Sequence, residues 1–242
     1  MDVIEYLNIP EKGKTNVKIA VKQICENLSA DAKTKRIIEK SVASFYVKGI
    51  LNADVTGMWG VDNDDYLYAE ILICRVTLKT DAYLQQANEL LNAVFQNPVI
   101  IVYDYDGRYA IGCAAKRKNK AEKNKSVIEK FYLTDTFAVD DLHKQLLSEI
   151  TYDKRNLKDF YDNVCNICLA EQYVKLTGRI PETIDETIKA KSAAIRRLNI
   201  QKRELESDYN QADSMQEKMD IHMKIKHIEK QLGDIKRSEE RR

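Results

Sequence analysis

The chain has 242 residues, of which 44% are hydrophobic, and this is enough to bury the core of one or at most two domains. Its net charge of +1 excludes a global attraction to nucleic acid or to a membrane surface, so any such attraction must be local. No apolar run has the length of a membrane span, the acidic start lacks the regions of a signal peptide, and five scattered cysteines are typical of reduced thiols. We therefore expect a soluble cytoplasmic protein.

The first 40 residues are expected to be helical. Apolar residues recur at helical spacing between Val17 and Leu28, and Ser29 or Asp31 can cap a second helix.

From residue 42 to residue 136 the pattern changes to the alternation that strands require. Asp81 is expected to cap a helix that ends at Asn97-Pro98, and Asp106-Gly107 is the clearest hairpin signal in the chain. We expect strands at residues 43–49, 66–78, 99–105, 108–115 and 127–133, the third of them central. This predicts an α+β fold with a mainly antiparallel sheet of about five strands covered by helices.

Helices resume after residue 139. Gly178 is expected to end one of them in a left-handed conformation, and Pro181 suits the first turn of the next. From residue 182 apolar residues follow two heptad registers that do not join in phase, and a capping-box pattern begins at Ser214 between them. We predict an antiparallel helical hairpin over residues 181–242, following an α+β domain over residues 1–178. One continuous rod about 90 Å long is the alternative.

The hairpin is the candidate surface for a protein partner or for a second copy of the chain. Lys191 and Lys202 occupy two seam positions, which makes a long self-sufficient dimer rod less favourable. A self-contained coil that only caps the domain stays open. The candidate partner-binding residues are Ile188, Ile195, Leu198, Leu205, Ile221, Ile225, Ile228 and Leu232.

No catalytic, metal or cofactor motif is recognised. Cys165-x-x-Cys168 lies inside an amphipathic helix without a second ligand pair, so core packing is favoured over zinc or redox chemistry. Asp104 and Asp106 flank a hairpin tip, where aspartate before glycine is a turn preference.

An acidic cluster suggests one alternative, a divergent metal-dependent nuclease. Glu70, Lys79 and one of Asp62, Asp64 or Asp65 would have to converge around a cation to activate water. A solvated turn is the favoured interpretation of the cluster, and the nuclease is the alternative to it.

The strongest local charge signal is a basic run at residues 116–125, between two expected strands. It holds six basic residues and one acidic residue, Glu122. Such a segment can contact phosphates without reading bases, and the alternative is a solvated connection. The candidate nucleic-acid-binding residues are Lys116, Arg117, Lys118, Lys120, Lys123 and Lys125.

Short motifs along nearly the whole chain resemble a bacterial family known only as a domain of unknown function. These motifs are Leu7-Asn8-Ile9-Pro10, Glu26-Asn27-Leu28-Ser29, Val99-Ile100-Ile101-Val102-Tyr103, Gly107-Arg108-Tyr109, Lys116, Phe131-Tyr132-Leu133-Thr134-Asp135, Tyr209-Asn210, Met219-Asp220-Ile221 and Lys224-Ile225. Members of that family are often encoded beside helicase and DNA-methyltransferase genes in restriction and phage-defence clusters. The resemblance implies an accessory subunit with a helicase or methyltransferase partner, and it implies no catalytic residue.

We therefore expect a non-enzymatic interaction subunit of such a system that contacts nucleic-acid backbone. The alternatives are the divergent nuclease and a structural homodimer without a nucleic-acid role.

Overall fold

The computed structural model describes residues 3–28, 31–122 and 125–240 and divides the chain into two compact units. Unit 1 is Met1–Cys168 and unit 2 is Leu169–Arg242. The division falls inside helix α7 (Leu157–Thr177), somewhat earlier than the boundary expected from the sequence.

Unit 1 is built around a six-stranded sheet in the order β1-β2-β5-β6-β7-β8. Strands β5 and β6 are parallel and all other neighbours are antiparallel, which confirms the mainly antiparallel α+β fold. The strands are β1 (Lys14–Ile19), β2 (Val42–Leu51), β5 (Ile71–Leu78), β6 (Val99–Tyr105), β7 (Arg108–Lys118) and β8 (Ser126–Leu133). A separate two-stranded ribbon consists of β3 (Val61–Asp62) and β4 (Leu67–Tyr68).

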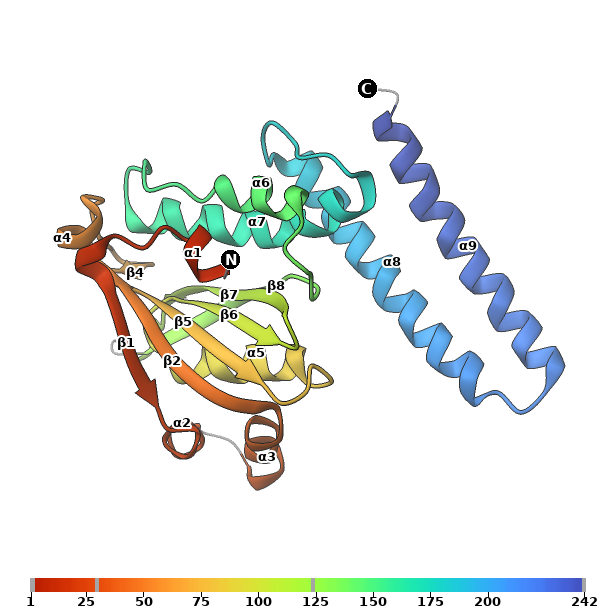
Figure 1. The fold of residues 1–242 in the computed structure, drawn as a ribbon, viewed down its shortest axis with the longest axis horizontal. Coiled ribbons are helices and arrows are strands. Elements are labelled where there is room, and N and C mark those ends of the chain that lie inside the picture. Colours follow the sequence, from red (N-terminus) through yellow and green to blue (C-terminus); the bar gives the residue numbers. More distant parts are fainter. Residues whose placement is uncertain (1–2, 29–30, 123–124, 241–242) are drawn as a thin grey trace. The chain divides into compact units, whose positions relative to one another are not determined.

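Helices cover both faces of the sheet in unit 1 (Figure 1). One face carries α2 (Val21–Asn27), α3 (Ala32–Ser41) and α5 (Leu84–Val94), and α5 is the crossover that makes β5 and β6 parallel. The other face carries α1 (Val3–Tyr6), α6 (Asp141–Ser148) and the first part of α7. Two short helical turns, η1 (Glu11–Gly13) and α4 (Ala53–Thr56), flank β1 and β2.

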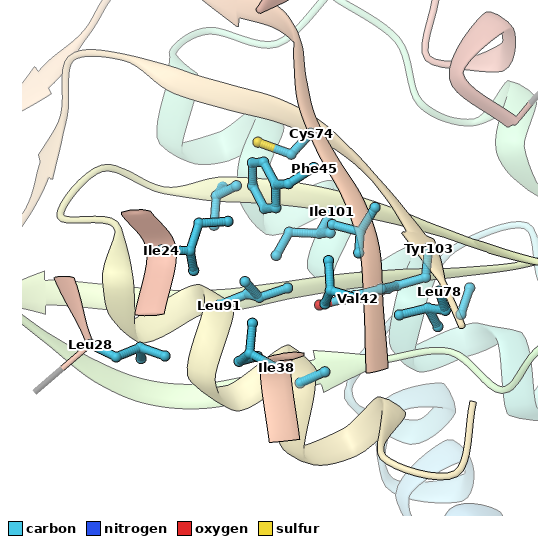
Figure 2. Packing of buried hydrophobic residues seen from close by; sticks show 14 of the residues in the cluster. Ile24, Leu28, Ile38, Val42, Phe45, Cys74, Leu78, Leu91, Ile101 and Tyr103 are labelled. Atoms are coloured by element: carbon cyan, nitrogen blue, oxygen red, sulfur yellow. The ribbon is translucent and has the colours of Figure 1, made fainter. Parts of the chain in front are cut away.

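The main core lies between α2, α3, α5 and the sheet. Figure 2 shows Ile24, Ile38 and Leu91 directed at the sheet residues Phe45 and Ile101. All five are at most 1% exposed, so each removes nearly its whole side chain from water, worth about 1.5–3 kcal/mol apiece.

Tyr161 of α7 fixes the opposite face of the sheet. Its hydroxyl accepts a hydrogen bond from the Ala114 amide at 3.0 Å and donates toward the Val99 carbonyl at 2.9 Å. The hydroxyl is fully buried, and these partners satisfy it.

The N-terminal helical expectation is wrong for residues 14–19, which form the edge strand β1 paired with β2. The apolar residues Val17 and Ile19 fit both a helical and a strand period, and pairing with β2 decides the outcome. The helix after Asp31 is confirmed, because the Asp31 carboxylate accepts from the Thr34 amide at 2.7 Å.

Three other boundaries differ from the sequence expectation. Residues 66–78 are two strands, β4 and β5, rather than one. Helix α5 begins after Tyr83 without a side-chain cap, so Asp81 does not cap it. Pro181 precedes α8 by several residues and is not in its first turn.

Unit 2 contains the antiparallel hairpin of α8 (Glu186–Gln211) and α9 (Met215–Glu240), so the continuous rod is excluded. Asp185 caps α8, and Ser214 accepts from the Glu217 amide at 3.1 Å, as expected at the start of α9. The seam lysines are paired: Lys191 with Glu239, and Lys202 with Glu229 at 2.9 Å. A cation in the seam is therefore matched by a carboxylate on the facing helix.

In the part of the chain that the structure describes, no helix combines the length and the apolar character needed to cross a membrane.

Candidate functional site

A pocket of about 220 Å³ opens in unit 1 where α5 ends against β7 and β8. It is lined by Leu67, Gln96, Asn97, Lys116, Arg117, Lys118, Lys125 and Ser126. Four of these residues belong to the basic run, and the described lining includes no carboxylate. We refer to it as the basic pocket.

Lys116 forms the inner part of this site and is only 3% exposed. Its ammonium donates to the carbonyl oxygens of Asn92, Phe95 and Asn97 at 2.8, 2.6 and 3.0 Å. These carbonyls lie in and just after the last turn of α5, where helix acceptors lack intrahelical donors. All three N–H groups of Lys116 are engaged, so this residue positions the pocket wall and adds charge without a free donor for a ligand.

Burial lowers the pKa of Lys116 to about 7. The chain around it is also fixed, because the hydroxyl of Tyr68 accepts from the Lys116 amide at 3.3 Å. Nothing in the sequence distinguishes Lys116 from the neighbouring lysines as the one that enters the interior. Lys116 is buried because β7 carries it next to the end of α5, where three backbone carbonyls accept hydrogen bonds from its ammonium.

The acidic cluster lies beside the basic run. Lys118 donates through its backbone amide to the carbonyl of Asp65 at 2.7 Å, and its ammonium pairs with Asp62 at 2.5 Å. Lys120, which is exposed, pairs with Asp65 at 3.1 Å. We call residues 62–65 the acidic turn. The acidic turn and the basic run are separate candidate sites in the sequence. In the structure they form one surface on which the opposite charges are paired.

The remaining cations also have carboxylate neighbours. Arg117 lies 3.6 Å from Glu129, and Lys125 lies 2.5 Å from Glu122. All these pairs are on the surface, where an ion pair contributes only about 0–1 kcal/mol and can be exchanged for another anion. Lys123, the sixth candidate of the basic run, lies outside the described residues.

Neutral polar groups complete the pocket. Gln96 accepts through Oε1 from the Ser126 amide at 3.0 Å, with the Ser126 hydroxyl 3.4 Å away. Asn97 donates to Glu70 at 3.1 Å. Sequence reasoning did not find Gln96, Asn97, Ser126 or Leu67, because their role depends on the packing of α5 against β7.

The residues of the nuclease alternative do not share one site. Glu70 and Lys79 flank the eight-residue strand β5 at opposite ends, so they are roughly 30 Å apart along an extended chain. Lys79 instead donates to the Glu39 carbonyl at 2.7 Å. No group of three or more potential ligands that could hold a metal ion occurs among the residues placed by the structure.

Cys165 and Cys168 lie in the core against Cys113 of β7. The Sγ atom of Cys113 is 3.3 Å from that of Cys165 and 3.9 Å from that of Cys168. Burial raises the pKa of Cys113 and of Cys165, which keeps these groups as thiols. The arrangement suits packing of α7 on the sheet rather than nucleophilic chemistry.

The candidate partner-binding residues of the hairpin face inward. All but Leu205, which is half-buried, are at most 9% exposed, and α8 packs against α9. Their side chains are therefore occupied within the hairpin itself. On α9 the exposed large apolar residues are Met215, Met219 and Met223, which are 79, 59 and 68% exposed and recur every fourth residue. We call them the methionine row, and their spacing is visible in the sequence.

Comparison with protein families finds a match. A family model described as "Domain of unknown function (DUF4391)" matches residues 7–232. The chain belongs to the DUF4391 family. No curated protein and no solved structure matches the chain.

The DUF4391 match spans both the basic pocket and most of the hairpin. In this DUF4391 chain the two features lie in different units, so each can be tested separately.

Proposed function

We propose that this DUF4391 protein is a non-enzymatic accessory subunit that contacts the phosphate backbone of a nucleic acid and binds a protein partner. The observation that carries the proposal is the basic pocket, in which Lys116, Arg117, Lys118 and Lys125 converge from β7 and the segment before β8. A bacterial restriction or phage-defence system in the cytoplasm is the setting that the family resemblance suggests, with a helicase or methyltransferase as partner.

Phosphate contact is favoured over base reading by the chemistry of the pocket. Arginine and lysine side chains are the usual phosphate ligands, and such contacts orient a protein on nucleic acid without specifying its sequence. The overall charge of +1 means that this attraction must come from the pocket and not from the whole molecule. Binding should therefore weaken steeply with salt.

Partner binding is assigned to the methionine row of α9. Exposed methionines provide adaptable apolar contacts, and three in a row at four-residue spacing form one continuous stripe on a helix. Ile195 and Ile225 are already buried within unit 2, so a partner would meet the outer face. A homodimer through the same stripe is the second candidate.

The first test measures binding of labelled single-stranded and duplex DNA across roughly 50 to 200 mM salt. The test variant is R117A/K118A/K125A, which keeps Lys116 because that residue holds the end of α5. The matched control, K22A/K33A/K40A, removes the same charge from exposed positions on α2 and α3. We expect salt-dependent binding that the test variant loses and the control keeps.

Two results would contradict the proposal. If both triple variants lost DNA binding to the same extent, the binding would be a general effect of charge and not a property of the pocket. Magnesium-dependent cleavage by the purified protein would show an enzyme. For the hairpin, light scattering of the wild type and of M215S/M219S/M223S separates the homodimer from a monomer that awaits a different partner.

A further inference from the structure

Resting on the proposed function, we propose that the basic pocket binds a terminal phosphate, the phosphomonoester found at the end of a nucleic-acid strand or on a mononucleotide. Arg117, Lys118 and Lys125 would neutralise the phosphate, and Ser126 would donate its hydroxyl.

The size of the pocket favours a chain end over the middle of a strand. Pockets for drug-sized ligands hold about 300–1,000 Å³, whereas this one holds about 220 Å³. A phosphate and part of its sugar fit such a volume. An internal phosphate is joined to a nucleotide on each side. Both of these nucleotides would have to fit through the opening, so an internal phosphate would remain at the rim.

The charge of the pocket also favours a terminal phosphate over an internal one. A phosphomonoester carries about −1.5 to −2 charges at neutral pH, more than the single charge of an internal diester. Three cationic side chains line the site in addition to Lys116, whose donors are already engaged, and each of the three has a surface carboxylate neighbour that a phosphate would displace. Leu67, which is 46% exposed, gives the site one apolar wall against which a sugar can pack.

The acidic turn is an internal competitor for this phosphate. Asp62 pairs with Lys118, and the backbone bond from the Lys118 amide to the Asp65 carbonyl holds the turn beside the strand. The Asp62 side chain is 71% exposed, so its departure needs no unfolding. A terminal phosphate would replace the Asp62 carboxylate as the partner of Lys118.

The experiment compares binding of short labelled single strands that carry a 5′-phosphate, a 3′-phosphate or only hydroxyl ends. Adenosine monophosphate serves as a competitor. We expect the phosphorylated strand to bind about tenfold more tightly than the hydroxyl strand, because two or more charge-assisted hydrogen bonds are gained. R117A/K118A/K125A should abolish this preference and K22A/K33A/K40A should keep it.

Asp62→Asn provides a test that misfolding cannot imitate, since it predicts a gain. Freed from its carboxylate, Lys118 should bind the phosphorylated strand about two- to fivefold more tightly. Asp81→Asn removes the same charge from another exposed position and should change nothing.

The outcomes separate this inference from the proposed function. Equal affinity for phosphorylated and hydroxyl ends, with both lost in the pocket variant, overturns the terminal-phosphate site and leaves the backbone contact standing. Binding of adenosine monophosphate without binding of any strand supports the phosphomonoester site and overturns the nucleic-acid role. If adenosine monophosphate competes as strongly as an unlabelled phosphorylated strand, the rest of the strand adds no affinity, and the site is assigned to mononucleotides. An Asp62→Asn variant with unchanged affinity overturns the competition by the acidic turn.

Discussion

The ammonium of Lys116 lies 2.6 Å from the carbonyl oxygen of Phe95, the residue at which helix α5 ends. Two further carbonyls, from Asn92 and Asn97, accept from the same group. The lysine therefore provides the donors that the last turn of α5 lacks, and its positive charge lies at the negative end of the helix dipole. One side chain thus fixes both the helix end and the inner wall of the basic pocket.

This arrangement predicts a pH dependence of stability. Burial lowers the pKa of Lys116 to about 7 from an unfolded value of 10.5, so the unfolded chain binds more protons between these two values. The free energy of unfolding should rise with pH over this interval, relative to Lys116→Met, by up to roughly 1 kcal/mol per pH unit. Urea unfolding of both proteins at about pH 7, 8 and 9 measures the difference. A difference independent of pH would show that the amine does not titrate there.

A second pKa shift is expected in the hairpin, at the carboxyl group of Glu229. Hydrogen bonds from Lys226 and Lys202 lower the pKa of this carboxyl to about 2. Because the folded-state pKa lies below the ordinary value of 4.5, the stabilisation is present above that value and is lost as the pH falls toward 2. NMR titration of Glu229 should show a higher pKa in Lys202→Met. Lys224→Met, the control on the same helix, should leave the pKa unchanged.

The seam of the hairpin should be far more sensitive to truncation than its outer face. Ile195 is fully buried and Met219 is 59% exposed. We expect Ile195→Ala to lower the free energy of unfolding by about 2–5 kcal/mol and Met219→Ala to change it by less than about 0.5 kcal/mol. Thermal or urea unfolding followed by circular dichroism measures both. Similar losses in the two variants would contradict the packing of α8 on α9.

The burial of the cysteines predicts slow reaction of their thiols with disulfide reagents. All five cysteines are free and buried, and Cys74 and Cys113 are fully enclosed. Burial raises the pKa of both, so few thiolates are present at neutral pH. Reaction with a disulfide reagent such as DTNB should be limited by unfolding in the native protein and fast for all five thiols in guanidinium. Rapid reaction of any thiol in the native protein would reveal an accessible site.

Local sequence signals predicted most of the fold. Asp106-Gly107 between two apolar runs specified the β6–β7 hairpin, with φ values of 49° and 72° at these residues. Gly178 takes the left-handed conformation expected at a helix end, with φ of 68°. Edge strand β1 was missed because its residues are mostly exposed, so no apolar face distinguishes it from a helix.

The candidate site was only partly predictable. Charge density singled out the basic run, since six cations in ten residues need no tertiary information. The pocket did need it, because Gln96 and Asn97 follow α5, Leu67 belongs to β4, and packing alone brings them to β7. The same holds for the pairing of Lys118 with Asp62, which lie 56 residues apart in the chain.

The methionine row also sets how this protein should be handled. Exposed thioethers are the first side chains that peroxide converts to sulfoxides, and a sulfoxide is polar where the thioether was apolar. Met215, Met219 and Met223 lie outside the packed seam, so their oxidation would leave the hairpin folded while removing its outer apolar stripe. An aged preparation would keep its helical content and its melting temperature. If the methionine row binds the partner, as we propose, that binding would be lost before any loss of structure became visible.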